Sequence, residues 1–207
     1  MKKIKRAGVL GAGVMGATIA AHLANAGLDV VMLDIVPKEL TPEESSKGLT
    51  LQTPAVRNRI AQNGLNSLLQ MKPAPFLLKE YASRIEIGNF EDHAAKLQGC
   101  DWVIEVVLEN MAVKKKVFQE VVIPNLKEDA VLSTNTSGLS VNEMATVLPE
   151  AVQKRFLVTH FFNPPRYMRL MEVVGCTKAD PGLVEAMAGF INRRLGKGIV
   201  QIGRAHV

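Results

Sequence analysis

The sequence predicts a doubly wound α/β domain with a mainly parallel sheet, and three observations carry this prediction. Short runs rich in valine, isoleucine and leucine alternate with helical patterns along almost all of the 207 residues. Aromatic residues make up only 5% of the chain, so its core must be aliphatic, as it is around strands buried on both faces. A glycine-rich turn joins the first apolar run to the first helical pattern. Strands and helices that alternate in this way form a sheet covered by helices on both sides.

The N-terminal segment predicts a βαβ unit. Residues 7–10 form a short apolar run, and residues 15–26 place small and apolar side chains at helical spacing until Gly27 ends the helix. Residues 29–33 form a second apolar run, which Asp34 closes. Strand, turn, helix and strand in this order predict two parallel strands of one sheet.

Residues 41–80 are more polar than the segments before them and lack their apolar runs. They predict a polar helical excursion inserted after the second strand. A threonine, a proline and two glutamates at residues 41–44 are typical of a helix start. Residues 57–71 carry isoleucine and leucine on a rough helical stripe, which Pro73 and Pro75 end.

The sheet pattern resumes after this excursion. We expect helices at residues 111–122, 141–148 and 181–195, and strands at residues 84–87, 102–107, 130–133, 156–160, 170–174 and 199–201. The last helix has a proline in its first turn, where the missing N–H leaves no helical hydrogen bond unmade. These elements extend the doubly wound pattern to the end of the chain.

The segment 11–16, Gly-Ala-Gly-Val-Met-Gly, predicts a dinucleotide site because it follows a strand and opens a helix. Gly11 allows the tight turn, Gly13 lets the backbone approach a pyrophosphate, and Gly16 lets helix and strand pack closely. The pyrophosphate then meets free N–H groups and the positive end of the helix dipole. A structural glycine turn without a ligand is the alternative, but the context favours a Rossmann-type nucleotide domain.

Asp34 stands 21 residues after Gly13, at the end of the second predicted strand. A carboxylate at this place accepts hydrogen bonds from the hydroxyls of the adenosine ribose. It also repels a 2′-phosphate, so the predicted cofactor is NAD rather than NADP. The alternative is that Asp34 merely ends the strand.

The segment 160–164, His-Phe-Phe-Asn-Pro, is followed by Glu172 on the next predicted strand. Oxidation of a secondary alcohol requires removal of the hydroxyl proton while hydride leaves. A histidine suits this task because its ordinary pKa, about 6.5, lies near working pH. Glu172 can hold the imidazole of His160 by its other nitrogen and favour the charged form. The alternative is a structural histidine at the end of an apolar strand.

Taken together, these motifs resemble the L-3-hydroxyacyl-CoA dehydrogenases of fatty-acid β-oxidation. The resemblance covers residues 4 to about 200 and includes Asn-Thr-Ser at 135–137 and Glu109-Asn110 followed by Lys114. Residues 34–37 and 72–75 resemble one branch in particular. That branch is the long bacterial fusions of this dehydrogenase with an enoyl-CoA hydratase.

The resemblance implies NAD-dependent oxidation of L-3-hydroxyacyl-CoA to 3-ketoacyl-CoA and a set of site residues. His160 and Glu172 match the catalytic dyad, and Ser137 matches a serine that contacts the substrate hydroxyl or the cofactor. The residues that match cofactor contacts are Gly11, Gly13, Met15, Gly16, Asp34, Glu109, Lys114 and Asn163, the last near the nicotinamide. The helical excursion would cover the CoA moiety, and Arg57, Arg59 or Lys72 could meet its phosphates, although ordinary surface charge is the favoured explanation for all three.

Composition argues against several other classes of protein. The net charge of +5 is modest, and no basic run is interleaved with aromatic residues as in nucleic-acid binders. The densest basic cluster, residues 114–116, is expected to be a solvated helix face. No apolar run approaches the roughly 20 residues that span a bilayer. Cys100 and Cys176 indicate neither a disulfide framework nor a metal site. We therefore expect no metal, no nucleic acid, no membrane contact and a cytoplasmic location, and the resemblance to bacterial fusions implies a bacterial source.

The family also contains an all-helical C-terminal domain, which supplies dimer contacts and one wall of the acyl pocket. Because that domain supplies dimer contacts, we expect the parent protein to be a homo-oligomer. Because its sequence is absent here, we expect this chain to bind NAD without efficient turnover. Residues 202–207, Ile-Gly-Arg-Ala-His-Val, match a translated sequencing-library adapter. The expected organisation is therefore a NAD-binding domain at 1–201 and a non-native tail at 202–207.

Two other functions remain open on the sequence. One is a two-domain β-hydroxyacid dehydrogenase of another family, which shares the glycine turn but typically uses a lysine base. The other is a non-catalytic dinucleotide-binding or structural relative. His160 with its downstream carboxylate argues against the first, and only an assay separates the second. His22, His93 and His206 lack comparable context, and no chemistry is assigned to them.

Overall fold

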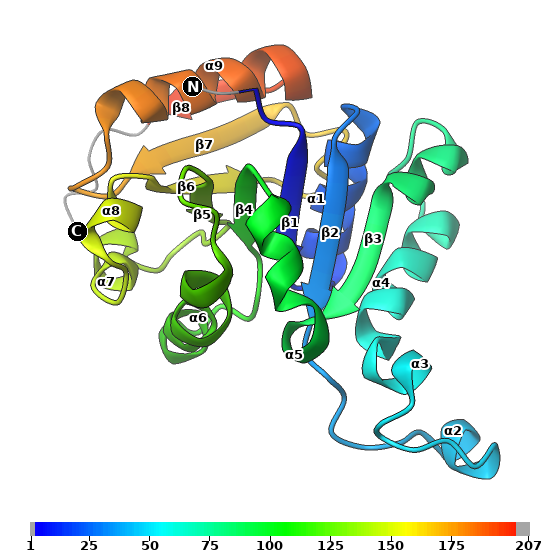
Figure 1. Ribbon diagram of the computed structural model, residues 1–207. Helices are drawn as coiled ribbons and strands as arrows, with labels where there is room; N and C mark the ends of the chain where they lie inside the picture. Colours follow the sequence, from blue (N-terminus) through cyan, green and yellow to red (C-terminus); the bar gives the residue numbers. More distant parts are fainter. Residues whose placement is uncertain (1–2, 202–207) are drawn as a thin grey trace.

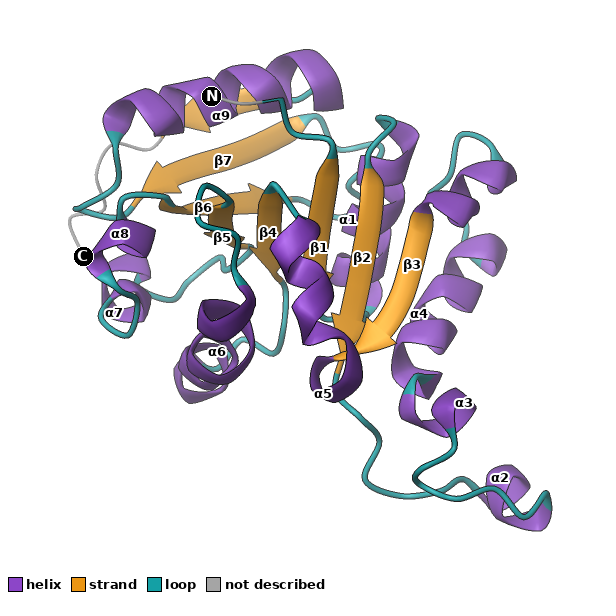
Figure 2. Cartoon of the chain, in the orientation of Figure 1, coloured by secondary structure: helices purple, strands orange, loops and turns teal. Residues whose placement is uncertain are grey.

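The computed structural model describes residues 3–201, which build a single eight-stranded sheet with helices on both faces (Figures 1 and 2). The strand order is β3-β2-β1-β4-β5-β6-β7-β8. The strands are β1 (Arg6–Leu10), β2 (Asp29–Asp34), β3 (Ile85–Asn89), β4 (Trp102–Glu105), β5 (Val131–Thr134), β6 (Phe156–Phe161), β7 (Leu170–Gly175) and β8 (Gly198–Gln201). The expected tail at 202–207 lies outside the described residues.

Strands β1 to β6 are parallel, so the predicted doubly wound fold is confirmed. The chain reverses once, because β7 pairs antiparallel with β6 and β8 then runs parallel to β7. The strand order changes direction between β1 and β4. From β1 the chain adds β2 and β3 on one side, and from β4 it adds the later strands on the other side. Ligands of open α/β sheets bind outside the carboxyl ends of the strands at this switch point.

Helices of the described chain cover the two faces in two groups. They are α1 (Val14–Asn25), α2 (Pro42–Ser46), α3 (Pro54–Arg57), α4 (Arg59–Gln70), α5 (Phe90–His93), α6 (Met111–Val117), α7 (Val141–Ala145), α8 (Glu150–Gln153) and α9 (Pro181–Leu195). Short helical turns are η1 (Lys79–Arg84), η2 (Ala94–Gly99), η3 (Phe118–Val122) and η4 (Ile123–Asn125). Residues from α1, α4 and α9 pack on one face, and residues from α6, η3 and α7 on the other.

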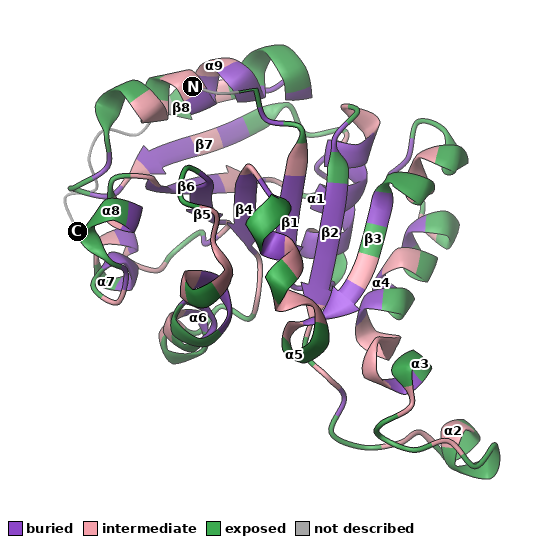
Figure 3. Cartoon of the chain, viewed as in Figure 1, coloured by how far each residue is buried: buried purple, intermediate pink, exposed green. Residues whose placement is uncertain are grey.

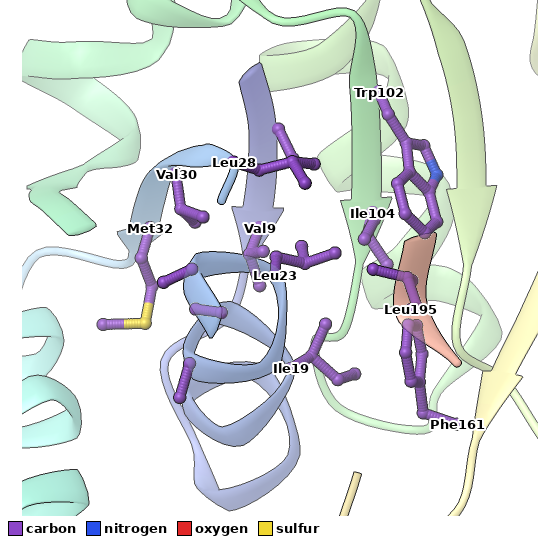
Figure 4. Close-up of a cluster of buried hydrophobic side chains, with 14 of the residues drawn as sticks. Val9, Ile19, Leu23, Leu28, Val30, Met32, Trp102, Ile104, Phe161 and Leu195 are labelled. Atoms are coloured by element: carbon purple, nitrogen blue, oxygen red, sulfur yellow. The ribbon is translucent and has the colours of Figure 1, made fainter. Parts of the chain in front are cut away.

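Alternation along each strand divides the core into two layers. In β2, Val30 and Met32 face the layer of α1, whereas Val31 and Leu33 face the layer of η3. Figure 3 shows β1, β2 and β4 buried over most of their length, and Figure 4 shows aliphatic side chains of the α1 layer together with Trp102. The predicted aliphatic core is therefore confirmed, and helices pack on both faces of the central strands.

The predicted excursion after β2 consists of α2, α3 and α4, and α2 projects away from the sheet (Figure 1). Helix α2 begins with a capping box, in which the Thr41 hydroxyl accepts from the Glu44 N–H and the Glu44 carboxylate accepts from the Thr41 N–H. Helix α4 returns to the sheet and crosses the glycine turn. A Cβ on Gly64 would lie 2.5 Å from the carbonyl oxygen of Ala12, so only glycine allows this approach.

Several expected elements differ in their bounds; the helix expected at 141–148, for example, ends at Ala145. Two of the differences have clear local reasons. Strand β4 ends at Glu105 rather than at residue 107, because the N–H of Val107 turns back to the Glu105 carboxylate at 2.7 Å. The helix expected at 111–122 is α-helical only to Val117 and continues as the wider π-helical turn η3. Within residues 3–201, none of the helices combines the length and the apolar character that crossing a membrane requires.

Candidate active site

The glycine turn between β1 and α1 has the geometry that its motif predicts. Gly11 has a φ of +109°, and a Cβ there would lie 2.6 Å from the carbonyl oxygen of Val106. A Cβ on Gly16 would lie 1.9 Å from the carbonyl oxygen of Gly11, so helix and turn touch. Gly13 differs from both, because no atom lies within 4 Å of the position its Cβ would take. The turn is therefore tight at Gly11 and Gly16 and open at Gly13.

The N-terminus of α1 is electrostatically positive. Gly13 is its N-cap and provides no side chain to bond the first N–H groups, and the first turn contains no acidic residue. The free N–H groups and the helix dipole consequently face the open space beside Gly13. This arrangement favours an anion such as a pyrophosphate.

Asp34 ties the end of β2 to the same turn. Its Oδ2 accepts a hydrogen bond from the N–H of Ala12 at 2.5 Å, and its Oδ1 accepts from the N–H of Ile35 at 2.7 Å. The carboxylate is half-buried and each oxygen keeps a second lone pair. Beyond it lies a groove of about 920 Å³ between residues 35–38, residues 90–95 and the helix formed by α6 and η3.

His160 and Glu172 face each other across the antiparallel pair of β6 and β7. The two residues are directly opposite in the strand register, and His160 Nδ1 lies 2.9 Å from Glu172 Oε2. Their side chains are 16% and 31% exposed, so the pair is shielded but reachable. The ring of Phe162 lies beside the imidazole, with ring centroids 4.5 Å apart. A histidine held in this way by a carboxylate has the arrangement of a general base with its orienting group.

A pocket of about 340 Å³ brings most of the predicted site residues together. Its lining includes Met15, Glu109, Lys114, Ser137, His160 and Asn163. These residues come from the start of α1, the segments after β4, β5 and β6, and α6. Glu172 lies opposite His160 on β7, while Gly11, Gly13 and Gly16 belong to the neighbouring turn, to which Asp34 bonds from the end of β2. All of the predicted site residues thus lie along the carboxyl edge of the parallel strands.

Lys114 is buried, which differs from the solvated face expected for residues 114–116. Its side chain is 1% exposed, and Nζ contacts Glu105 Oε1 at 2.8 Å and Glu109 Oε2 at 3.2 Å. Lys116 alone matches the expectation well, with 70% exposure, and Lys115 is 25% exposed. The ammonium of Lys114 therefore neutralises the carboxylates of Glu105 and Glu109 at the wall of the pocket. Its contact with a cofactor remains a prediction.

Glu105 is a site residue that sequence reasoning missed. Its carboxylate is fully buried. Oε1 accepts from Lys114 Nζ at 2.8 Å and from the N–H of Val107 at 2.7 Å, and Oε2 accepts from the hydroxyl of Thr134 at 2.6 Å. The sequence contains one signal for this role. Glu105 is a carboxylate at the end of an otherwise apolar strand, nine residues before Lys114. Glu105 positions both Lys114 and the loop that carries Glu109.

Glu109 holds the segment that follows β5. Its Oε1 accepts from the hydroxyl of Thr136 and from the N–H of Ser137, the latter at 3.2 Å. Burial alone would raise the pKa of Glu109, but the hydrogen bond from Thr136 and the ammonium of Lys114 outweigh it, so the pKa lies below its usual value. The carboxylate is therefore ionised at neutral pH and fixes Ser137 at the pocket. Asn135 anchors β6 from the same segment, because its Oδ1 accepts from the N–H of Phe161 at 2.8 Å.

With this geometry, residues 6–205 match the family described as 3-hydroxyacyl-CoA dehydrogenase, NAD binding domain. The chain belongs to this family. The resemblance inferred from the motifs is thereby confirmed, and the dinucleotide domain is the NAD-binding domain of 3-hydroxyacyl-CoA dehydrogenases.

Individual members of the family are similar to the chain over most of its length. A Bacillus subtilis protein named "Probable 3-hydroxyacyl-CoA dehydrogenase" is 48% identical over 157 residues, which are 76% of this chain and 20% of that protein. A Deinococcus radiodurans protein of the same name is 41% identical over 144 residues, covering 70% of this chain and 41% of that one. The crystal structure of the Archaeoglobus fulgidus 3-hydroxyacyl-CoA dehydrogenase matches with a TM-score of 0.70 at 29% identity, covering 98% of this chain and 58% of that one. The chain thus spans between about a fifth and three fifths of these relatives.

Two of the three cations considered for the CoA phosphates are already paired within the chain. Arg57 contacts Glu91 at 2.7 Å and Asp92 at 2.6 Å, and Arg59 contacts Glu44. The guanidinium of Arg57 lowers the pKa of Asp92 to about 2. Arg57 ties the excursion to α5 and Arg59 pairs within the excursion, so neither guanidinium is left unpaired for a CoA phosphate. Among residues 3–201, no group of histidine, cysteine and carboxylate side chains could hold a metal ion.

The burial of His22, a residue without an assigned role in catalysis, should make the free energy of unfolding depend on pH. Burial, together with the ammonium of Lys197, lowers its pKa to about 4. The unfolded chain takes up this proton near the ordinary pKa of about 6.5, so the folded state loses stability as the pH falls below that value. We expect His22 to remove about 2 kcal/mol of unfolding free energy between about pH 7 and pH 5.

Urea unfolding at several pH values measures this effect. His22→Gln, which cannot titrate, should lose less stability than the parent chain over the same interval, whatever its stability at neutral pH. Equal slopes for the two proteins would show that His22 is not buried in its neutral form.

Proposed function

We propose that this chain binds NAD and supplies the general base with which a 3-hydroxyacyl-CoA dehydrogenase oxidises L-3-hydroxyacyl-CoA to 3-ketoacyl-CoA. The observation that carries the proposal is the His160–Glu172 pair, 2.9 Å apart, at a pocket that Ser137 and Asn163 also line. A base, a hydroxyl and an amide at one small pocket suit the recognition of a hydroxyl group that is to lose its proton.

The residues present fit NAD. Gly13 leaves room for a pyrophosphate at the positive end of α1, and Asp34 offers a carboxylate at the end of β2 for the adenosine ribose. The groove beyond Asp34 and the pocket at His160 lie toward the two ends that a dinucleotide would occupy. When bound, NAD supplies the acceptor for the hydride that leaves the substrate carbon.

The proton chemistry follows from the dyad. With Nδ1–H donating to Glu172, Nε2 of His160 is left as the acceptor for the proton of the substrate hydroxyl. Protonation makes the imidazole cationic, and the adjacent carboxylate stabilises that charge. Ser137 and Asn163 would orient the hydroxyl and the nicotinamide at the same pocket, with Ser137 held through Glu109.

The alternative family with a lysine base is disfavoured by the same contacts. Of the residues described by the structure, Lys114 is the one lysine that lines this pocket, and its ammonium pairs with Glu105 and Glu109. An ammonium held between two carboxylates is already engaged, whereas Nε2 of His160 is turned to the pocket.

The setting of the parent protein is part of the proposal. We propose a bacterial cytoplasmic enzyme that forms homo-oligomers through parts of the protein beyond this chain. Two observations support the compartment. Cys100 and Cys176 are buried, unpaired thiols, which suit a reducing environment, and the related sequences from Bacillus subtilis and Deinococcus radiodurans are bacterial.

Calorimetric titration with NAD tests the cofactor site directly. We expect NAD to bind with a dissociation constant of about 1 µM to 1 mM, the range usual for such ligands, and NADP to bind at least about tenfold more weakly because of Asp34. Gly13→Val is the matched variant. Its Cβ meets no atom within 4 Å, so the melting temperature should stay near that of the parent while NAD binding is lost.

Absence of heat with NAD, or equal affinity for NAD and NADP, would contradict the cofactor assignment. Unchanged NAD binding by Gly13→Val would show that the ligand does not approach this turn. NADH formation with 3-hydroxybutyryl-CoA by the longer parent protein tests the reaction itself.

A further inference from the structure

Lys197 is a buried cation that lies outside the pocket. It follows Gly196, which ends α9 with a φ of +66°, and directly precedes β8, and only 2% of its surface is exposed. Its Nζ donates hydrogen bonds to the carbonyl oxygens of Pro165 and Met168, the latter at 2.7 Å. Both carbonyls belong to the loop at 162–169 that joins β6 to β7. Lys197 therefore holds the loop on which Asn163 stands.

The same ammonium lies under the ring that follows His160. Nζ of Lys197 is 5.8 Å from the ring centroid of Phe161, within the range of a cation–π interaction. His22 packs on this ring from α1 with centroids 6.3 Å apart. The Phe161 ring lies in the core layer of α1 together with Leu195 (Figure 4), whereas His160 points to the opposite face. Lys197 and His22 thus contact the Phe161 ring on the face of β6 opposite to the one that carries His160.

Lys197 is costly to bury where it stands. Among residues 3–201 no carboxylate pairs with it, and burial lowers its pKa to about 8. A charge withdrawn from water without a counter-charge is unfavourable, and an apolar side chain of similar size would suit a core better. A cation at such a place indicates a demand other than stability.

We propose that Lys197 is a positioning residue for the oxidation, which holds the loop at 162–169 and the ring of Phe161 so that His160 and Asn163 keep their places at the pocket. The inference rests on the proposed function, because it assigns to Lys197 a role in presenting the base. Arg166 and Tyr167 secure the other side of the same loop. Arg166 donates to the carbonyl oxygens of Ala74 and Phe76 at 2.6 and 2.8 Å, and the Tyr167 hydroxyl donates to Ala74 at 3.0 Å.

The test compares Lys197→Met with Lys154→Met, which changes an exposed lysine at the end of α8 that does not line the pocket. In the longer parent protein, we expect Lys197→Met to lower kcat by about 10- to 100-fold, as small displacements of catalytic groups do. The dissociation constant for NAD should change less than about twofold, since the glycine turn is untouched. Lys197→Arg, which keeps the charge and the donors, should recover part of the loss, and Lys154→Met should match the parent.

A second readout needs no turnover and uses the chain itself. Nitrogen NMR of the His160 ring reports its tautomer, and we expect the parent chain to show the Nδ1–H form and Lys197→Met a mixture. If Lys197→Met does not fold, Phe161→Leu, which removes the ring but keeps an apolar side chain, should produce the same mixture. A folded variant with parental kcat and an unchanged His160 tautomer would overturn the inference. Absence of turnover in the parent protein would instead contradict the proposed function, and the NMR comparison would still decide the role of Lys197.

Discussion

Replacement of His160 by glutamine is expected to lower kcat for 3-hydroxyacyl-CoA oxidation by about 100- to 10,000-fold, the usual contribution of a general base. Glutamine keeps a polar group of similar size that can still reach Glu172, but it cannot accept a proton at working pH. NAD affinity should remain near that of the parent, because the glycine turn and Asp34 are unaffected. Steady-state NADH formation and calorimetric titration measure the two quantities separately.

Two further variants control this experiment. Glu172→Gln should reduce kcat less than His160→Gln, because it removes the stabilising charge but leaves the base. His93→Gln replaces a histidine whose Nδ1 accepts from the N–H of Asn89, away from the pocket, and should leave kcat unchanged. A His160→Gln enzyme that retains parental kcat would rule out His160 as the base.

Replacement of Lys114 by methionine is expected to destabilise the chain by about 3–5 kcal/mol, the usual effect of removing one partner of a buried ion pair. The reason is Glu105, whose carboxylate is fully buried and would lose its counter-charge. Lys115→Met, one residue along, is the matched control. Lys115 pairs with Glu143, which is 55% exposed, and such surface pairs contribute at most about 1 kcal/mol.

The double variant Glu105→Gln/Lys114→Met separates the charge from the packing. Glutamine keeps an acceptor for Thr134 without a buried charge, so the double variant should be more stable than the sum of the two single effects implies. Urea unfolding measures all four proteins. Additive losses would mean that Lys114 stabilises the chain through its methylene stem rather than through Glu105.

Much of the fold could be predicted because its signals are local. The order of strands and helices follows from hydrophobic period and from glycine and proline, and α9 was predicted with its observed bounds. The direction of β7 could not be predicted, since an apolar strand has the same composition in either direction. The pairing of His160 with Glu172 was expected from the family, but its basis in the antiparallel register became visible only in the structure.

The contacts that sequence reasoning missed join residues far apart in the chain. Glu105 looks like the end of an apolar strand, and its function depends on Lys114 and Thr134. Arg57 is a surface cation by composition, but the fold places it on Asp92, 35 residues away. Lys197 is an isolated lysine until the loop at 162–169 folds over it. In each case the missing information is the tertiary neighbour rather than a property of the residue.

The reversal at β7 has a consequence for how the dyad can vary among relatives. His160 and Glu172 meet because they are opposite each other in a ladder of backbone hydrogen bonds. The twelve positions that separate them in the chain are incidental. Insertions or deletions within the connecting loop would leave the dyad intact, whereas a slip of β7 by a single residue would turn the carboxylate to the other face. A search for this chemistry in distant sequences should therefore allow a variable gap between histidine and glutamate. It should require instead that the two residues fall on the same face of two neighbouring strands.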